Sequence, residues 1–220
     1  MSLIDLITGN AGNQVAADAE NKFGISKNQI IALLAVAAPL VISYLRKKSQ
    51  DSPQEAEELN NALDKDHDGS ILNDPSQAAA RQQEGDSILD HVFGSQKADV
   101  ENQLSQKTGI SVDKIGPILA MLAPVIMGFI GKEKQETGIN SGGGLGDLLG
   151  GILGSATSQV QQQQAQGNSS PLTEILGSVL GGANQGSGGG LGDILRSVLG
   201  DDQQSEGGLG GLLGSLFDRK

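Results

Sequence analysis

The sequence predicts an all-α protein with two tandem, pseudo-symmetric helical units followed by short helices rich in glycine and leucine. Three observations predict this fold: a duplication within residues 1–135, one long apolar stretch in each copy, and a leucine pattern of helical spacing in the rest of the chain. We expect the following organisation: helical unit 1 over residues 1–50, a connector over 51–85, helical unit 2 over 86–136, and a tail over 137–220 with four short amphipathic helices.

The composition limits the kinds of function open to the chain. Aromatic residues make up only 2% of the 220 residues, so a core must be built from Leu, Ile, Val and Ala. The net charge of −11 argues against nucleic-acid binding, which needs clustered Lys and Arg. The chain has no cysteine, and its first residues lack the basic start of a secretory signal, so we expect a cytoplasmic protein.

The duplication matches the chain to itself 85 positions later without a gap. Both copies have a short apolar opening, a polar helix, a Gly-Ile-Ser turn whose Ser stands at an N-cap position, and a long apolar helix with a central Ala-Pro. One unit used twice predicts the same fold twice, with the two long helices side by side. The matched pairs include Ser2 and Ser87, Asp5 and Asp90, Gly9 and Gly94, Val15 and Val100, Lys22 and Lys107, Gly24 and Gly109, Ile30 and Ile115, and Pro39 and Pro124.

The two long apolar stretches, Ile30–Leu45 and Ile115–Ile130, contain no charge. Sixteen helical residues span about 24 Å, which is less than the roughly 30 Å of bilayer hydrocarbon. Their shortness, their central prolines and their pairing favour helices buried on all sides in a protein core. The alternative stays open that they enter a membrane, with Arg46-Lys47-Lys48 as a positive flank.

The tail repeats one apolar pattern four times, with the spacing i, i+3, i+4, i+7, i+8 that places side chains on one helix face. Each segment has about nine residues, too few for a stable isolated helix, and interior glycine costs about 1 kcal/mol. We expect these segments to fold only by docking on the core, each other, another chain or a membrane, and to be disordered otherwise. The four sets are Leu145-Leu148-Leu149-Ile152-Leu153, Leu172-Ile175-Leu176-Val179-Leu180, Leu191-Ile194-Leu195-Val198-Leu199 and Leu209-Leu212-Leu213-Leu216-Phe217.

The connector carries a stretch with the pattern of a calcium-binding loop, DKDHDGSILNDP. Aspartates alternate at ligand positions 1, 3 and 5, glycine follows at the turn position, and an aliphatic residue stands at position 8. Position 12 is Pro75, and the closing carboxylate comes one residue early. Oxygen ligands in this pattern favour calcium over zinc or magnesium. The predicted ligands are Asp64, Asp66, Asp68 and Asp74, with the backbone carbonyl of Ser70.

Two interpretations without an ion also fit this stretch. Asp-Gly with nearby Asp and Asn is ordinary turn chemistry, and Asp74 can cap a helix that begins with Pro75 and runs to Gln83. However, three carboxylates within five residues repel one another, and Lys65 is the only cation nearby in the sequence. We therefore predict a weak calcium site, with a dissociation constant of about 10⁻⁵ to 10⁻³ M, that braces the connector.

Catalytic motifs are absent from the sequence. The two histidines, His67 and His91, have no partner evident in the sequence, and no nucleophile elbow, phosphate loop or helical His pair is present. The glycine-rich runs lack the strand-then-helix context of a dinucleotide site. We therefore expect a protein that is not an enzyme.

The glycine-leucine runs Gly142–Gly154 and Gly188–Gly200, and the unit Ile88–Gly131, resemble the YidB-like bacterial family of unknown function. The resemblance implies a small all-α fold without an established activity and assigns no functional residue. We expect a non-catalytic structural or interaction protein that is braced by calcium and forms homo-oligomers through its leucine-glycine helices, with another protein partner also open. The alternative is a membrane-associated protein whose apolar helices or tail enter a bilayer.

Overall fold

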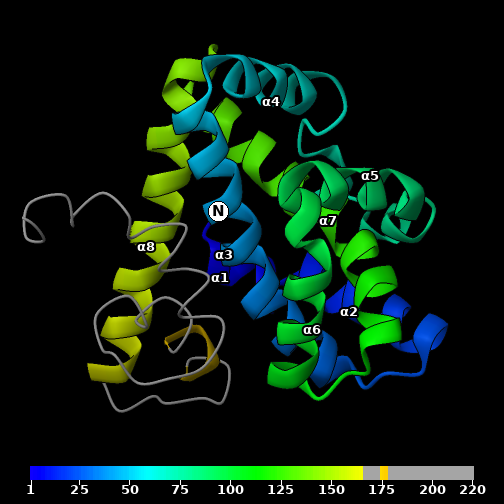
Figure 1. The fold of residues 1–220 in the computed structure, drawn as a ribbon. Helices are drawn as coiled ribbons and strands as arrows, with labels where there is room; N and C mark the ends of the chain where they lie inside the picture. The colour runs from blue at the N-terminus through cyan, green and yellow to red at the C-terminus, as the bar shows by residue number, and fades with distance from the viewer. Residues whose placement is uncertain (166–173, 178–220) are drawn as a thin grey trace, which may run out of the picture.

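The computed structural model describes residues 1–165 and 174–177, and every regular element in them is a helix, which confirms the predicted all-α fold (Figure 1). The α-helices are α1 (Leu3–Thr8), α2 (Asn10–Phe23), α3 (Lys27–Asp51), α4 (Pro53–Lys65), α5 (Gln82–Phe93), α6 (Lys97–Thr108), α7 (Val112–Thr137) and α8 (Leu145–Ala165). Four short 3₁₀ helices join them: η1 (Ser70–Leu72), η2 (Pro75–Ala79), η3 (Gly94–Gln96) and η4 (Gly142–Gly144).

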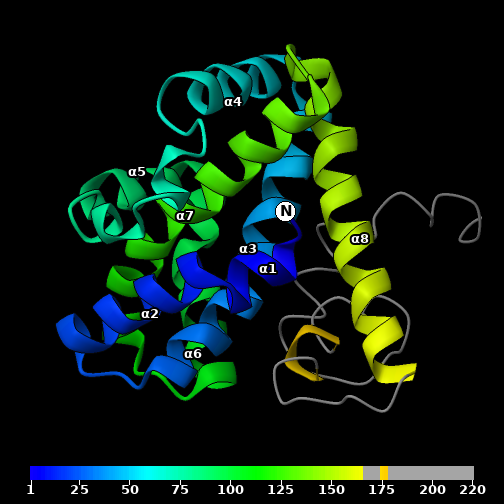
Figure 2. The same ribbon diagram turned by 180° about the vertical axis from the view of Figure 1, so that it is seen from behind.

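The two long helices α3 and α7 form the centre of the fold. They contact each other, α2 and α6 each contact both of them, α8 packs along α3, and α5 packs on α7 (Figures 1 and 2). In the most apolar 18-residue window of each helix, 78% of α3 and 83% of α7 is buried. Length and composition alone would let either helix cross a membrane, but the core helices of soluble proteins share these properties.

The helix boundaries recur at the offset of the duplication. Gly24 caps the C-terminus of α2 and Gly109 that of α6, both in the left-handed conformation that glycine adopts without strain, with φ of 66° and 70°. Ser26 and Ser111 then occupy the predicted N-cap positions of α3 and α7, although only the Ser26 hydroxyl accepts a backbone N–H. The two copies differ in their first helix, since α5 begins at Gln82 and is twice as long as α1. A pseudo-symmetric arrangement of the two units stays a prediction.

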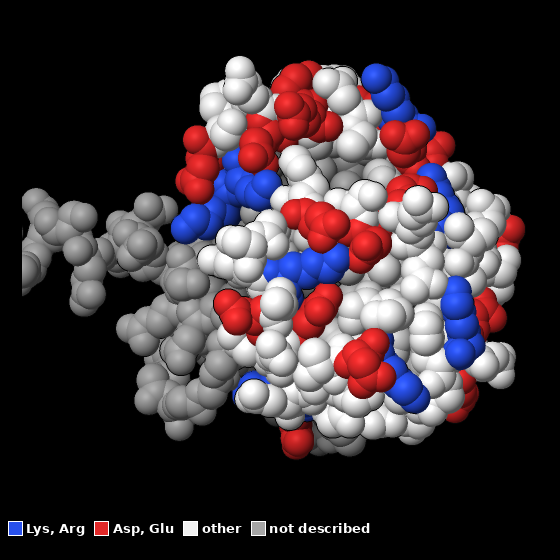
Figure 3. Space-filling model, turned by 45° about the vertical axis from the view of Figure 1, so that its right-hand side comes forward, with Lys and Arg blue, Asp and Glu red and all other residues white. Residues whose placement is uncertain are grey.

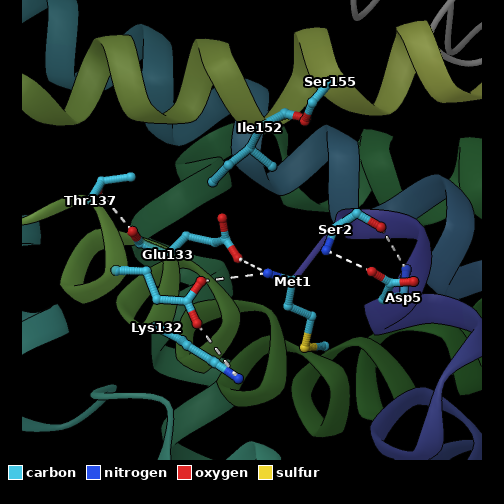
Figure 4. A network of polar contacts seen from close by, with 9 residues as sticks. Met1, Ser2, Asp5, Lys132, Glu133, Thr137, Ile152 and Ser155 are labelled. Atoms are coloured by element: carbon cyan, nitrogen blue, oxygen red, sulfur yellow. Dashed lines mark hydrogen bonds and ion pairs between the residues drawn. The ribbon is translucent and has the colours of Figure 1, made fainter.

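The first residues of the chain close against the end of α7 (Figure 4). The Met1 amino group lies 3.0 Å from Glu133 Oε1 and 3.5 Å from Glu136 Oε2. The Ser2 side chain accepts the Asp5 N–H at 3.1 Å, and the Asp5 carboxylate accepts the Ser2 N–H at 2.9 Å. This reciprocal capping box fixes the start of α1 beside α7.

The first leucine-glycine segment forms α8, a helix of 21 residues rather than the nine that its leucine pattern predicts. The helix continues because its apolar face continues: Ala156 and Val160 follow the leucines at helical spacing and are buried with them. Of the second segment only residues 174–177 are described, and they form one helical turn. The segments over 191–199 and 209–217 lie outside the described residues.

Candidate functional site

The leucine face of α8 is buried against the helical core. Leu145 and Leu149 are 0% exposed, and the other apolar residues of the pattern are also buried. α8 contacts mainly α3, with smaller contacts to α1, α4 and α7. Burying an aliphatic side chain of this size contributes about 1.5–3 kcal/mol, so this face is held firmly. The helix that contains the first leucine-glycine segment is therefore stabilised by docking on its own chain.

Glycines let α8 and the turn before it pack closely against neighbouring helices. A Cβ built at Gly142 would lie 2.7 Å from the backbone of Ala56, so η4 crosses α4 where only glycine fits. Built Cβ atoms at Gly146 and Gly150 would lie 3.3 Å from Gln50 Cγ and 3.1 Å from Arg46 Nε. Gly146 and Gly150 thus pack against the polar end of α3, whereas Gly154, one further turn along α8, has open space beside it.

The described part of the second segment docks on the first. Leu176 is 1% exposed. A Cβ built at Gly177 would lie 2.5 Å from Gln164 Nε2 and 3.4 Å from Val160 Cγ1. The turn at 174–177 therefore packs on the last turns of α8, beyond the leucine positions of the first segment.

The aspartate loop runs between α4 and η2 and lies directly on α7. A Cβ at Gly131 would lie only 1.7 Å from the His67 carbonyl oxygen, and one at Gly128 would lie 2.4 Å from Ile71 Cγ2. Gly131 thus lets the loop backbone lie directly against α7, and Gly128 leaves room there for the side chain of Ile71. Gly69 has the positive φ of 92° expected of the turn glycine, and Ile71 is 2% exposed, as expected for the inward aliphatic position.

The first three predicted ligands each have a separate environment. Asp64 Oδ1 lies 2.5 Å from Nζ of Lys134, a side chain that is 2% exposed. Asp66 caps the C-terminus of α4. Asp68 Oδ1 accepts the Ser70 N–H at 2.9 Å, and hydrogen bonds from the Ser70 hydroxyl and backbone lower the pKa of Asp68. The carboxylate at position 1 is thus paired with a lysine from a distant helix.

The remaining predicted ligands make local turn and cap contacts. The Ser70 carbonyl accepts the Asn73 N–H at 3.0 Å. The Asp74 carboxylate accepts the Ser76 hydroxyl at 2.5 Å and Gln77 Nε2 at 2.9 Å, and these two bonds lower its pKa. Asp74 and Pro75 do stand at the N-cap and first position of a helix, but that helix is the 3₁₀ helix η2, which ends at Ala79.

These positions do not form a cation cage in the observed conformation. Among residues 1–165 and 174–177, no three His, Asp or Glu side chains converge as metal ligands would. A calcium ion would require Asp64 to leave Lys134 and the other carboxylates to turn toward a common point. Calcium binding at this loop therefore stays a prediction.

The residues that hold the loop lie far from it in the sequence. Lys65 is not the cation beside Asp64, because that place belongs to Lys134 of α7. Arg81 Nη2 donates to the Asp66 carbonyl at 3.0 Å, and Gln135 Nε2 donates to that of Asp68 at 3.1 Å. The sequence contains one signal of this packing. Gly131 stands 85 positions after Arg46, and the change from arginine to glycine indicates that something packs on α7 that does not pack at the same place on the first copy.

Charged side chains of both signs are interspersed on the face drawn in Figure 3. Lysine and arginine lie next to aspartate and glutamate there. Ion pairs on the described surface include Lys48–Glu55 at 2.9 Å and Lys97–Asp86 at 2.7 Å. The basic groups on this face therefore alternate with acidic ones and do not form one continuous patch across it.

A family model described as a bacterial protein of unknown function (DUF937) matches residues 5–133, which include most of both copies of the duplication and the whole connector. No curated protein and no solved structure matches the chain. The matched region ends before α8, so the leucine-glycine tail lies outside it.

Proposed function

The chain belongs to the DUF937 family of bacterial proteins of unknown function, and we propose that it is a non-catalytic assembly protein whose helical core binds leucine-glycine segments. The docking of α8 carries this proposal. Its leucine face is buried along α3, and the packing of such a face supplies most of the stability of a helix in a protein. The core is thus a receptor for this motif.

Because the chain has more than one such segment, its core could bind a segment from another chain, and chains could assemble in this way. The sequence holds three further segments with the same apolar spacing, at 172–180, 191–199 and 209–217. A further segment that replaces α8 on the core of a neighbouring copy would join two chains through the contacts that α8 now makes within one. Several weak segments on one chain raise the effective concentration of the next, so the association gains avidity.

Calcium bracing of the connector is a separate part of the proposal. The turn at Gly69 and the buried Ile71 support it, since both agree with the loop pattern. The pairing of Asp64 with Lys134 opposes it, because that contact must break before a cation can approach Asp64. The ion would then fix the connector more firmly, but assembly through the tail does not depend on it.

Light scattering over a concentration series tests the assembly proposal in the full-length protein. We expect a mass above that of the monomer that rises with concentration. A variant with Ile194→Asp, Leu195→Asp, Leu212→Asp and Leu213→Asp should lose most of the mass above that of the monomer, because charges on the apolar faces of two of the three further segments cannot be buried. The control places the same four charges at Gln185, Ser187, Gln203 and Gln204 and should keep the wild-type mass.

The truncation that complements these variants ends after Ala165. Ending the chain at Thr137 would remove α8 and expose its partner surface on α3, so that protein would not be a neutral reference. The membrane-associated alternative has its own outcome. If the protein is a monomer at every concentration and floats with liposomes, the assembly proposal is wrong and the membrane-associated alternative holds.

A further inference from the structure

The turn η4, which leads into α8, meets the core backbone to backbone. Gly142 is buried there, and its N–H donates to Glu57 Oε2 of α4 at 3.1 Å. A Cβ built at Gly142 would lie 2.7 Å from both the Ala56 carbonyl carbon and the Glu57 nitrogen. Backbone atoms of a helix cannot rotate aside as a side chain can, so any larger residue at this position forces η4 away from α4.

The next glycine contacts of this segment are with side chains. Built Cβ atoms at Gly146 and Gly150 would meet the side chains of Gln50 and Arg46. Both neighbours are long side chains, and a change of rotamer can make room beside them. The core therefore requires glycine strictly at the position of Gly142 and only loosely at the other two positions.

The three further segments differ at the position of Gly142, which lies three residues before the first leucine. Serine in the second segment and glutamate in the fourth carry a Cβ, for which α4 leaves no room. The glutamate would also bring a second carboxylate next to that of Glu57, and like charges repel. The third segment has the required glycine. The residues at this position are Ser169, Gly188 and Glu206 in the second, third and fourth segments.

The rest of the third segment also fits the surface that α8 covers. Residues 142–154 read GGGLGDLLGGILG, and residues 188–200 read GGGLGDILRSVLG. On the buried face the two stretches differ only at 194 and 198, where one aliphatic side chain replaces another, an exchange that cores tolerate well. Ser197 takes the place of Gly151, which has nothing within 4 Å of a built Cβ.

Arg196 is the exchange that opposes the fit. It takes the place of Gly150 and would meet the side chain of Arg46, but both guanidinium groups stand at the ends of long side chains that can separate. Given that the core binds segments from other copies as proposed above, we propose that residues 188–200 are the segment it takes, and that Gly188 selects this segment by its fit on the α4 backbone.

Labelled synthetic peptides test this selection on the full-length protein. Peptides of residues 167–182, 186–201 and 204–219 carry the second, third and fourth segments, and fluorescence anisotropy measures their binding. The third-segment peptide should bind about five-fold more tightly than the other two, or better. In the fourth-segment peptide, Glu206→Gly should remove most of this difference, because it supplies the missing glycine.

Two alanine substitutions in the third-segment peptide form a matched pair. Gly188→Ala should weaken binding about five-fold or more, because its methyl group would enter the α4 backbone. Gly189→Ala should leave the affinity unchanged, because Gly189 stands at the place of Gly143, which is exposed with nothing within 4 Å of a built Cβ. Both changes are in the peptide, so the fold of the protein is the same in every measurement.

A substitution in the protein should have the opposite effect. Gly142→Ala weakens the docking of the chain's own η4 and so leaves the surface open more often, which should tighten binding of the third-segment peptide. Gly143→Ala is the control and should not change it. Equal binding of the three peptides, or of Gly188→Ala and Gly189→Ala, would overturn the selection but not the assembly proposal. Binding by none of the peptides would overturn both.

Discussion

Gly131 shows how a single residue positions the aspartate loop. It sits on α7 with no room for a side chain, since a Cβ there would enter the His67 carbonyl group. Lys134, one helical turn later, pairs with Asp64 and also donates to the Asn60 carbonyl at 3.4 Å. A buried ammonium needs such partners, so close approach and charge pairing together hold the loop against α7.

Gly131→Ala should destabilise the protein by about 2–3 kcal/mol, because the loop backbone must move away from the new methyl group. Gly154→Ala is the matched control. Gly154 lies within α8 with nothing within 4 Å of a built Cβ, so alanine should stabilise the protein by about 0.5–1 kcal/mol. Urea unfolding measures both changes. Equal effects in the two variants would contradict the close packing of the loop on α7.

His67 predicts a loss of stability on mild acidification. Burial lowers its pKa from the ordinary 6.5. The unfolded chain therefore binds a proton more readily than the folded one, so stability is present at neutral pH and falls as the pH drops below about 6.5, by up to about 1.4 kcal/mol per pH unit. Asp68 and Asp74 have lowered pKa values and contribute stability that is lost only near and below 3.8, outside this window.

Unfolding free energies between pH 7 and pH 5 test this effect. The slope attributable to His67 should vanish in His67→Gln, which keeps a polar side chain but takes up no proton. The same slope in wild type and His67→Gln would show that another group controls the acid sensitivity.

At the scale of elements, spacing in the sequence predicted which residues share a face but not what that face meets. The leucine positions of α8 were predictable from period 3.6, and all of them are buried. The full length of the helix was not predicted, because Ala156 and Val160 lie beyond the repeated pattern and are held by tertiary packing. In the connector, the pattern predicted the turn at Gly69, but the pairing of Asp64 with a residue 70 positions later has no local signal.

In the connector, calcium and Lys134 would compete for the carboxylate of Asp64. Calcium should bind wild-type protein weakly, and Lys134→Met should bind it about five-fold more tightly, because Asp64 no longer has a competing partner worth about 1 kcal/mol. Isothermal titration measures both. Asp66→Ala/Asp68→Ala is the control and should abolish the heat. Equal heats in wild type and the control would show that the aspartate loop does not bind calcium.

For the whole molecule, the duplication predicted more of the fold than any single motif. The order of helices, the left-handed glycines at Gly24 and Gly109, and the N-cap positions of both long helices follow from the repeat. The close fit of Gly142 on the α4 backbone could not be predicted, because η4 and α4 are brought together by packing alone. The surface that receives α8 was equally hidden, since α3 is apolar throughout its centre and gives no sign of which side is covered.

Cross-linking between chains tests most directly whether the surface under α8 receives segments from another copy. The chain has no cysteine, so single cysteines can be placed at will. Gly146 of α8 lies beside Gln50 of α3. In the third segment, Gly192 stands at the position that Gly146 has in the first. Chains carrying Gln50→Cys are mixed with chains carrying Gly192→Cys, and Ser187→Cys replaces Gly192→Cys as a control outside the apolar segments. A disulfide between the two kinds of chain that forms faster with Gly192→Cys than with Ser187→Cys is the predicted result. Equal rates with both, or no disulfide between chains, would contradict the assembly proposal.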